Sequence, residues 1–230
     1  MKWRKVLPLL TPLFFLIGFA SCVTKVKREF PVDFRASTGM AVYENEAYRW
    51  VATTLGPVEL EEAWVTKGVI TDDYLAAENS DIAGLKVGTH AWIKNSTVRG
   101  SAQIGTIARF YDSQVQGQLT VGEDLDAHDS IFYGPVTVGG LVTAICSNFE
   151  QELAAPSEII CLSGSETKTI RVYSCGLYYD PQVVRLSEGS QVKGDIIFES
   201  GRGRVVIDAS SKLHGKIYGG QIIHPFKYDG

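Results

Sequence analysis

A repeat of about 17 residues runs through the middle of the chain and constrains its fold more than any other feature. Four successive stretches read SDIAGLKVGTHAWIKN, STVRGSAQIGTIARFYD, SQVQGQLTVGEDLDAHD and SIFYGPVTVGGLVTAIC. They begin 16, 17 and 17 residues apart, and a further step of 17 reaches another serine, Ser147. Self-similarity at a fixed short period is typical of a solenoid, in which each unit buries its apolar side against the next.

Equivalent positions of the repeat carry equivalent chemistry. An Asn or Asp followed by Ser opens each unit, which gives the corner pairs Asn79–Ser80, Asn95–Ser96, Asp112–Ser113 and Asp129–Ser130. The third position is apolar, and these residues are the predicted core ladder: Ile82, Val98, Val115 and Phe132. The fifth position is glycine: Gly84, Gly100, Gly117 and Gly134. The pattern returns near the end, where SQVKG and SKLHG add Val192, Gly194, Leu213 and Gly215.

Within each unit the apolar residues alternate, which is the period of a β-strand. Glycine or an Asx-Ser pair interrupts each run after three to five residues. Glycine and Asx residues accept the positive φ of a sharp corner. Three short runs and three corners make one coil, and stacked coils make an all-β parallel β-helix. An antiparallel sandwich with evenly spaced turns is the alternative, although hairpins do not need the same residue type at every seventeenth position.

Two segments depart from the regular repeat. Residues 40–63 are expected to form an N-terminal cap on the β-helix domain, which spans residues 40–230, because the first coil of a solenoid needs a covered end. Residues 147–182 break the register and are expected to form an inserted irregular segment, with one short helical possibility in NFEQELA. The closing residues, 220–230, are expected to cover the final coil.

The coil block resembles the bactofilins, the bacterial polymer-forming β-helix proteins. The resemblance rests on Ser-x-apolar-x-Gly at about 17-residue spacing, as in STVRG, SQVQG and SQVKG, and it covers roughly residues 64–146 and 183–220. It implies a right-handed, three-sided solenoid whose copies join end to end into filaments without a nucleotide.

The first residues predict export. Lys2, Arg4 and Lys5 precede an apolar run that ends at a small residue, which is typical of a secretory signal peptide over residues 1–21. Phe19-Ala20-Ser21-Cys22 resembles a bacterial lipobox, which implies lipidation at Cys22 followed by a tether over residues 22–39; an ordinary cleaved signal is the alternative. Val23 follows instead of Asp, and by resemblance to Gram-negative lipoproteins this favours the outer membrane.

The net charge and the cysteines bear on nucleic-acid binding and on disulfide formation. A net charge of -4 gives no support to nucleic-acid binding. Besides Cys22 the chain has Cys146, Cys161 and Cys175. Two cysteines of an exported protein can pair, and Cys161 with Cys175 is the favoured pair, with three free thiols as the alternative.

No catalytic motif is present, so we expect no enzyme activity and no cofactor or metal. A left-handed β-helix acyltransferase is the enzymatic alternative, for which His90 and His128 are the candidate residues. The acidic stretch GEDLDAHD at 122–129 matches no calcium-loop spacing and is interpreted as a solvated face.

The sequence therefore predicts a non-enzymatic envelope lipoprotein, attached to the membrane through its lipid anchor. It would act as a β-helix scaffold or as a module that associates with itself through its coil ends or with another envelope protein. The alternative is a surface adhesin or glycan-binding module, since Trp92, Tyr111 and Tyr133 lie at outward positions and could stack on sugars.

Overall fold

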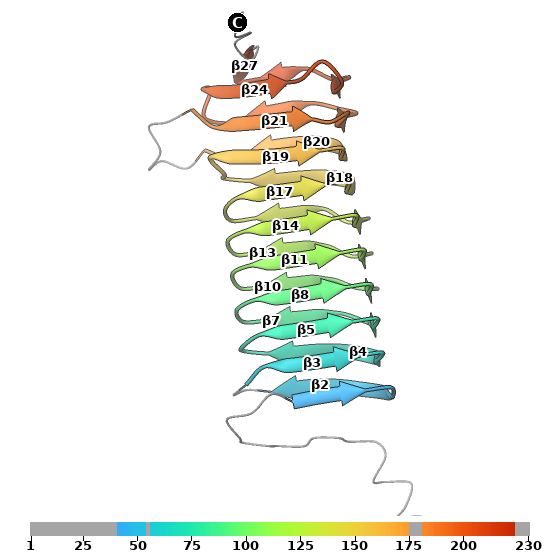
Figure 1. Cartoon of the computed structure of the whole chain (residues 1–230). Helices are drawn as coiled ribbons and strands as arrows, with labels where there is room; N and C mark the ends of the chain where they lie inside the picture. The colour runs from blue at the N-terminus through green and yellow to red at the C-terminus, as the bar shows by residue number, and fades with distance from the viewer. Residues whose placement is uncertain (1–40, 54–55, 175–180, 224–230) are drawn as a thin grey trace, which may run out of the picture. The chain divides into compact units, whose positions relative to one another are not determined.

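The strands of this chain stack one coil upon the next (Figure 1). The computed structural model describes residues 41–53, 56–174 and 181–223, and within these residues the chain forms 27 β-strands and no helix. Strands of successive coils pair in parallel. The predicted parallel β-solenoid is therefore confirmed.

One sheet, here called sheet A, takes a single strand from every coil. Among the described residues it holds 11 strands in the order of the chain. They are β1 (Ala41–Glu44), β3 (Val58–Glu61), β5 (Leu75–Glu78), β8 (Ala91–Lys94), β11 (Ala108–Tyr111), β14 (Leu125–His128), β17 (Val142–Ile145), β19 (Ile159–Ser163), β21 (Val183–Ser187), β24 (Gly203–Ile207) and β27 (Gly220–Ile223).

The second sheet, sheet B, holds 16 strands within the described part of the chain and contains two columns. The first column contains β6 (Asp81–Ile82), β9 (Thr97–Val98), β12 (Gln114–Val115), β15 (Ile131–Phe132), β22 (Gln191–Val192) and β25 (Lys212–Leu213). The second contains β7 (Leu85–Val87), β10 (Ala102–Ile104), β13 (Leu119–Val121), β16 (Val136–Val138), β23 (Ile196–Phe198) and β26 (Ile217–Tyr218). Longer strands join the columns: β2 (Ala47–Thr53), β4 (Trp64–Thr71), β18 (Asn148–Ala155) and β20 (Glu166–Val172).

Each regular coil contributes three strands, as β9, β10 and β11 do. Equivalent serines of the regular coils lie 16, 17, 17 and 17 residues apart, followed by a step of 18. The coil between Ser165 and Ser190 is longer, with a step of 25 residues. The backbone of each coil bonds mainly to the coils before and after it, so the fold has few contacts within a single repeat.

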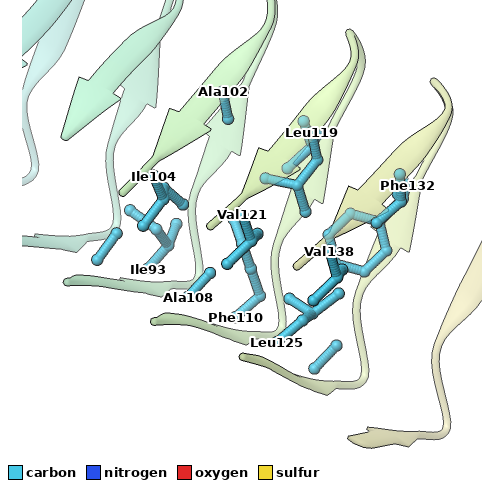
Figure 2. Close-up of a cluster of buried hydrophobic side chains, with 14 of the residues drawn as sticks. Ile93, Ala102, Ile104, Ala108, Phe110, Leu119, Val121, Leu125, Phe132 and Val138 are labelled. Atoms are coloured by element: carbon cyan, nitrogen blue, oxygen red, sulfur yellow. The ribbon is translucent and has the colours of Figure 1, made fainter. Parts of the chain in front are cut away.

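Inward-facing side chains form continuous apolar ladders along the solenoid. The core ladder predicted from the repeat is fully buried at Ile82, Val98, Val115, Phe132 and Val192. Figure 2 shows neighbouring ladders, in which Ala102 and Leu119 follow one another, as do Ile104, Val121 and Val138. Burying one such side chain stabilises the fold by about 1.5–3 kcal/mol. A narrow core is therefore sufficient when many coils are stacked.

Three phenylalanine rings pack one against the next in this core. The rings of Phe110 and Phe132 meet edge to face with centroids 5.4 Å apart. The rings of Phe132 and Phe149 are stacked, with centroids 4.9 Å apart. The 4.9 Å separation is close to the spacing of adjacent strands. Phe149 therefore has the same position in its coil as Phe132 has in the coil before.

The segment expected to be an insertion is largely regular solenoid. Between residues 147 and 182, strands β18, β19 and β20 pair in parallel with the coils on both sides. The helix expected over NFEQELA is wrong, because Asn148–Ala155 is a strand. Phe149 and Leu153 have a helix-like spacing of four, yet both are buried, since the pairing register shifts between Phe149 and Glu152 where the strand passes from one column to the other.

The segment expected to be a cap over residues 40–63 also contains solenoid strands. β1 pairs with β3, and β2 pairs with β4. Tyr43 and Tyr48 are in register with the buried residues Leu60 and Val65, so their rings point into the coil. The two rings meet edge to face with centroids 5.1 Å apart, and Tyr43 is only 8% exposed. Tyrosine rings thus occupy the lumen of the first described coil.

Candidate functional site

The predicted corner serines form a hydrogen-bonded ladder. The Oγ of each serine accepts a hydrogen bond from the backbone N–H of the residue one coil earlier and donates one to a carbonyl oxygen two residues earlier in its own chain. The acceptor distances are 3.1 Å for Ser80, 2.9 Å for Ser96, 3.1 Å for Ser113 and 3.2 Å for Ser130. All four serines are buried. Their hydroxyls therefore satisfy backbone donors that the corner would otherwise leave without a partner.

The ladder continues past the point at which the sequence pattern is lost. Ser147, Ser165 and Ser190 occupy the same column, with acceptor distances of 3.2, 3.0 and 3.2 Å. Ser165 was not among the predicted corner residues, although a serine 18 residues after Ser147 was visible in the sequence. Ser211 is also buried.

The residue before each corner serine has a left-handed backbone. The φ angles are 51° at Asn79, 46° at Asn95, 49° at Asp112 and 49° at Asp129. The same column contains Cys146 (φ 50°) and Gly164 (φ 58°). Asn and Asp tolerate this conformation better than other residues with a Cβ, which explains their recurrence in the repeat. Cys146 stands where another coil has an Asx residue.

The predicted corner glycines are needed for a different reason from the one expected. None of Gly84, Gly100, Gly117, Gly134, Gly194 and Gly215 is among the glycines with positive φ. They are required where the backbone of an adjacent coil approaches closely. A Cβ on Gly134 would lie 2.3 Å from the carbonyl oxygen of Gly117, and one on Gly215 would lie 2.1 Å from that of Gly194. Gly84 is the least restricted, with 3.3 Å to the nearest atom.

Many charged side chains on the outer surface pair across adjacent coils. Lys94 Nζ lies 2.8 Å from Glu78 Oε1, and Arg99 Nε lies 2.6 Å from Asp81 Oδ1. Arg171 Nε lies 3.2 Å from Glu152 Oε2, and Lys193 pairs with Glu166. Cross-strand pairs of this kind contribute roughly 0.2–1 kcal/mol each. They stabilise the stack and leave these charges already neutralised.

The acidic stretch 122–129 lies on and beside β14. The Oδ1 of Asp126 lies 3.0 Å from His128 Nε2, and the Oδ1 of Asp124 accepts a hydrogen bond of 2.8 Å from the N–H of Leu141. Within the described ranges no three His, Cys, Asp or Glu side chains are grouped as a metal site would require. Asp124 and Asp126 therefore act as hydrogen-bond acceptors at the surface.

The three aromatic residues proposed as a sugar platform do not form one continuous surface. Tyr111 stacks on His128 with ring centroids 5.0 Å apart, and Trp92 lies 6.5 Å from Tyr111. Lys94 Nζ lies over the Trp92 ring, 5.8 Å from its centroid. Tyr133 is 42% exposed but lies beyond β15, on sheet B. Protein neighbours thus lie against one face of the Tyr111 ring and against the Trp92 ring.

The two histidines considered for acyl transfer lie apart on the solenoid. His90 precedes β8, whereas His128 ends β14, two coils later. His128 bonds to Asp126 and stacks on Tyr111, and His90 is exposed. The fold does not bring the two imidazoles together.

The covalent sites predicted from the sequence fall mainly outside the described residues. Cys22 and Cys175 both lie there. Cys161 is half-buried on β19, in a regular coil, and carries a free thiol, as does the exposed Cys146. None of the described residues forms a helix long and apolar enough to cross a membrane.

The last described coil leaves its apolar interior open. Leu213, Ile217 and Ile222 are in register with Val192, Ile196 and Val205, which are fully buried one coil earlier. Leu213 and Ile217 are only half-buried, and Ile222 is 48% exposed. Among the described strands, β25, β26 and β27 each pair on one side only. The end of the coil thus combines apolar side chains with a strand edge. Residues 224–230, expected to contribute to its cover, lie outside the described residues.

No known protein family, curated protein or solved structure matches this chain.

Proposed function

We propose that this chain is a non-enzymatic scaffold of the bacterial cell envelope, exported and anchored by lipid at Cys22, that associates with itself through the C-terminal end of its solenoid. The solenoid is suited to such a role because its strands are stabilised from coil to coil. An additional set of strands at the end would continue the same ladders.

One observation carries this proposal: the core ladder is exposed where the described coils end. Ile222 points into the interior, in register with the buried Val205, yet almost half of its side chain is accessible. An unpaired strand edge beside exposed apolar side chains is a template for pairing with another chain. Burial of these ladder residues by a second copy would supply the apolar contact that the coil lacks.

The N-terminal end differs in chemistry. Tyr43 and Tyr48 occupy the lumen of the first described coil and contact one another. Val51, on β2, is fully buried. The described residues therefore favour the C-terminal end as the site of contact between copies.

The anchor is supported by the basic start, the apolar run and the lipobox-like Phe19-Ala20-Ser21-Cys22. Cys22→Ser is the direct test. We expect this variant to lose incorporation of radiolabelled palmitate and to leave the membrane fraction. Undiminished labelling would contradict lipidation at this residue.

Self-association is tested with the full chain in detergent, by sedimentation velocity and negative-stain electron microscopy over a range of protein concentrations. We expect higher-order species for the wild type and a shift to monomer for Ile222→Lys, because a charge cannot be buried in the contact without a partner. Leu141→Lys is the matched control, since Leu141 is also 48% exposed but lies between β16 and β17, far from either end. A wild type that remains monomeric at all concentrations would rule out this form of scaffold.

A further inference from the structure

The last two strands of sheet A, β24 and β27, lie near the C-terminal end of the stack (Figure 1). Residues of these two strands line an open cleft. Its volume is about 600 Å³, and its walls include Pro181, Arg202, Gly203, Arg204, Gly219 and Gly220. This volume is in the range of sites for small organic ligands. None of the walls belongs to the serine ladder, and none is one of the exposed ladder residues Leu213, Ile217 and Ile222.

Three of the residues that line the cleft are the glycines Gly203, Gly219 and Gly220. The buried ring of Phe198 fills the space next to Gly203 and Gly220, where a Cβ would lie 2.0 and 2.7 Å from ring atoms. Gly219 has a φ of 66°, and a Cβ on it would lie 2.1 Å from the carbonyl oxygen of Phe198. The interior therefore requires glycine at these positions, and they contribute only main chain to the walls of the cleft.

The rim of the cleft is cationic. Arg202 and Arg204 are both exposed and flank Gly203 at a spacing of two residues. Arg204 lies in register between Val183 and Gln221, which are uncharged. In the part of the chain that the structure describes, no carboxylate pairs with Arg204 or lines the cleft. The nearby Glu199 lies 3.6 Å from Arg171 Nη1.

This distinguishes Arg204 from four cations of the earlier coils. Lys94, Arg99, Arg171 and Lys193 each have a carboxylate partner on an adjacent coil. Arg185, on β21, adds further positive charge near the cleft. It is in register with Val206 of β24, which lies two residues after Arg204. A concave site that presents the guanidinium group of Arg204, with no carboxylate among its described walls, favours an anion, and the planar guanidinium fork suits the oxygens of a phosphate group.

We propose that the cleft between Arg202, Arg204 and the Gly219–Gly220 backbone binds a phosphate group carried by a small organic ligand. A phosphorylated sugar and the headgroup of an anionic lipid share this chemistry, and both fit the volume of the cleft. This proposal goes beyond the scaffold role: Ile222 is not among the walls of the cleft, although Gly220 belongs to the edge strand β27.

The test is a titration of the full chain in detergent, labelled with ¹⁵N-glycine, followed by nuclear magnetic resonance. The probes are inorganic phosphate, glucose 1-phosphate and a water-soluble short-chain phosphatidylglycerol, with glucose as the uncharged reference. We expect the phosphate probes to shift the amide signals of Gly203, Gly219 and Gly220, and glucose to leave them unchanged. Tighter binding of glucose 1-phosphate than of the lipid would identify a phosphorylated sugar as the ligand class, and the reverse would identify a lipid headgroup.

Two arginine variants decide the assignment. Arg204→Gln and Arg202→Gln should each weaken binding by about tenfold, as expected for loss of a charge-assisted hydrogen bond. Arg109→Gln is the matched control, because Arg109 is an exposed arginine on the same sheet but on β11, and it should bind as the wild type does. Absence of any glycine shift, unchanged affinity in Arg204→Gln, or an equal loss in Arg109→Gln would each overturn the proposal. The thermal unfolding of Arg204→Gln should match that of the wild type, since the side chain is exposed.

Discussion

The Oγ of Ser113 accepts a hydrogen bond of 3.1 Å from the backbone N–H of Ser96, 17 residues earlier in the chain and one coil away in space. Ser96 bears the same relationship to Ser80, at 2.9 Å. A serine side chain at the corner of each coil thus bonds to the coil before it. The sequence separation between successive serines equals the length of one coil. The coil length can therefore be read from the spacing of these serines in the sequence.

Ser113→Ala should lower the free energy of unfolding by about 1–3 kcal/mol, because it leaves the buried N–H of Ser96 without an acceptor. Chemical denaturation would measure the change. Ser101→Ala is the control, since Ser101 is exposed and its hydroxyl takes no part in the ladder, and we expect little effect. Equal losses in the two variants would show that the ladder contributes nothing specific.

The effect of substitutions at Cys146 on the free energy of unfolding should depend on the left-handed backbone conformation of this position. Cys146→Asn should raise the free energy of unfolding by about 0.5 kcal/mol, because Asn tolerates positive φ better. Cys146→Val should lower it by about 1–2 kcal/mol, because a β-branched residue is strained there. Thr143→Val, at an ordinary strand position of the same coil, is the control. The ranking Asn, Cys, Val in thermal unfolding is the outcome to check, and a reversed ranking would contradict the assignment.

Gly105→Ala should be strongly destabilising, although nothing about the φ angle forbids it. Its Cβ would lie 1.9 Å from the carbonyl oxygen of Gly88, so the two coils would have to separate. We expect a loss of about 2–3 kcal/mol, at the upper end of the range for an overpacked site. Gly84→Ala, where the nearest atom lies 3.3 Å away, should cost less than half as much. The two variants are compared by urea denaturation, and similar losses would count against the close-approach explanation.

Asp208 should make the last coils sensitive to acid. Hydrogen bonds from Ser211 and from the N–H of Glu188 hold the pKa of this carboxyl well below its ordinary value of 3.8. A pKa lowered in the folded state contributes stability that is present above the ordinary pKa and is lost as the pH falls below it towards the folded value. The free energy of unfolding of the wild type should therefore decline more steeply below about pH 4 than that of Asp208→Asn. Unfolding curves recorded at several acidic pH values would measure this, and parallel declines in the two proteins would contradict it.

The regular coils were predictable because each residue type there depends only on its position in the repeat and on the neighbouring residues. Ser, Asx and apolar residues recur at one period, and the alternation between Val115 and its polar neighbours Gln114 and Gln116 identifies which face is buried. The same logic failed over residues 148–155. There the apolar spacing of Phe149 and Leu153 resembles a helix, and only the corner between the two columns of sheet B explains why both residues point inward.

By itself, the sequence determined the parallel solenoid, the coil length, the corner column and the apolar ladder, since these are properties of one repeat copied along the chain. The tertiary structure decided what depends on the approach of one coil to another. It showed that Gly100 and Gly134 are needed because the backbones of adjacent coils meet there, whereas the residues with positive φ lie in a different column. It also showed that Ile222 is exposed although its register partner Val205 is buried. The physical reason is that burial in a solenoid is provided by the next coil, and a single repeat does not reveal where the stack ends.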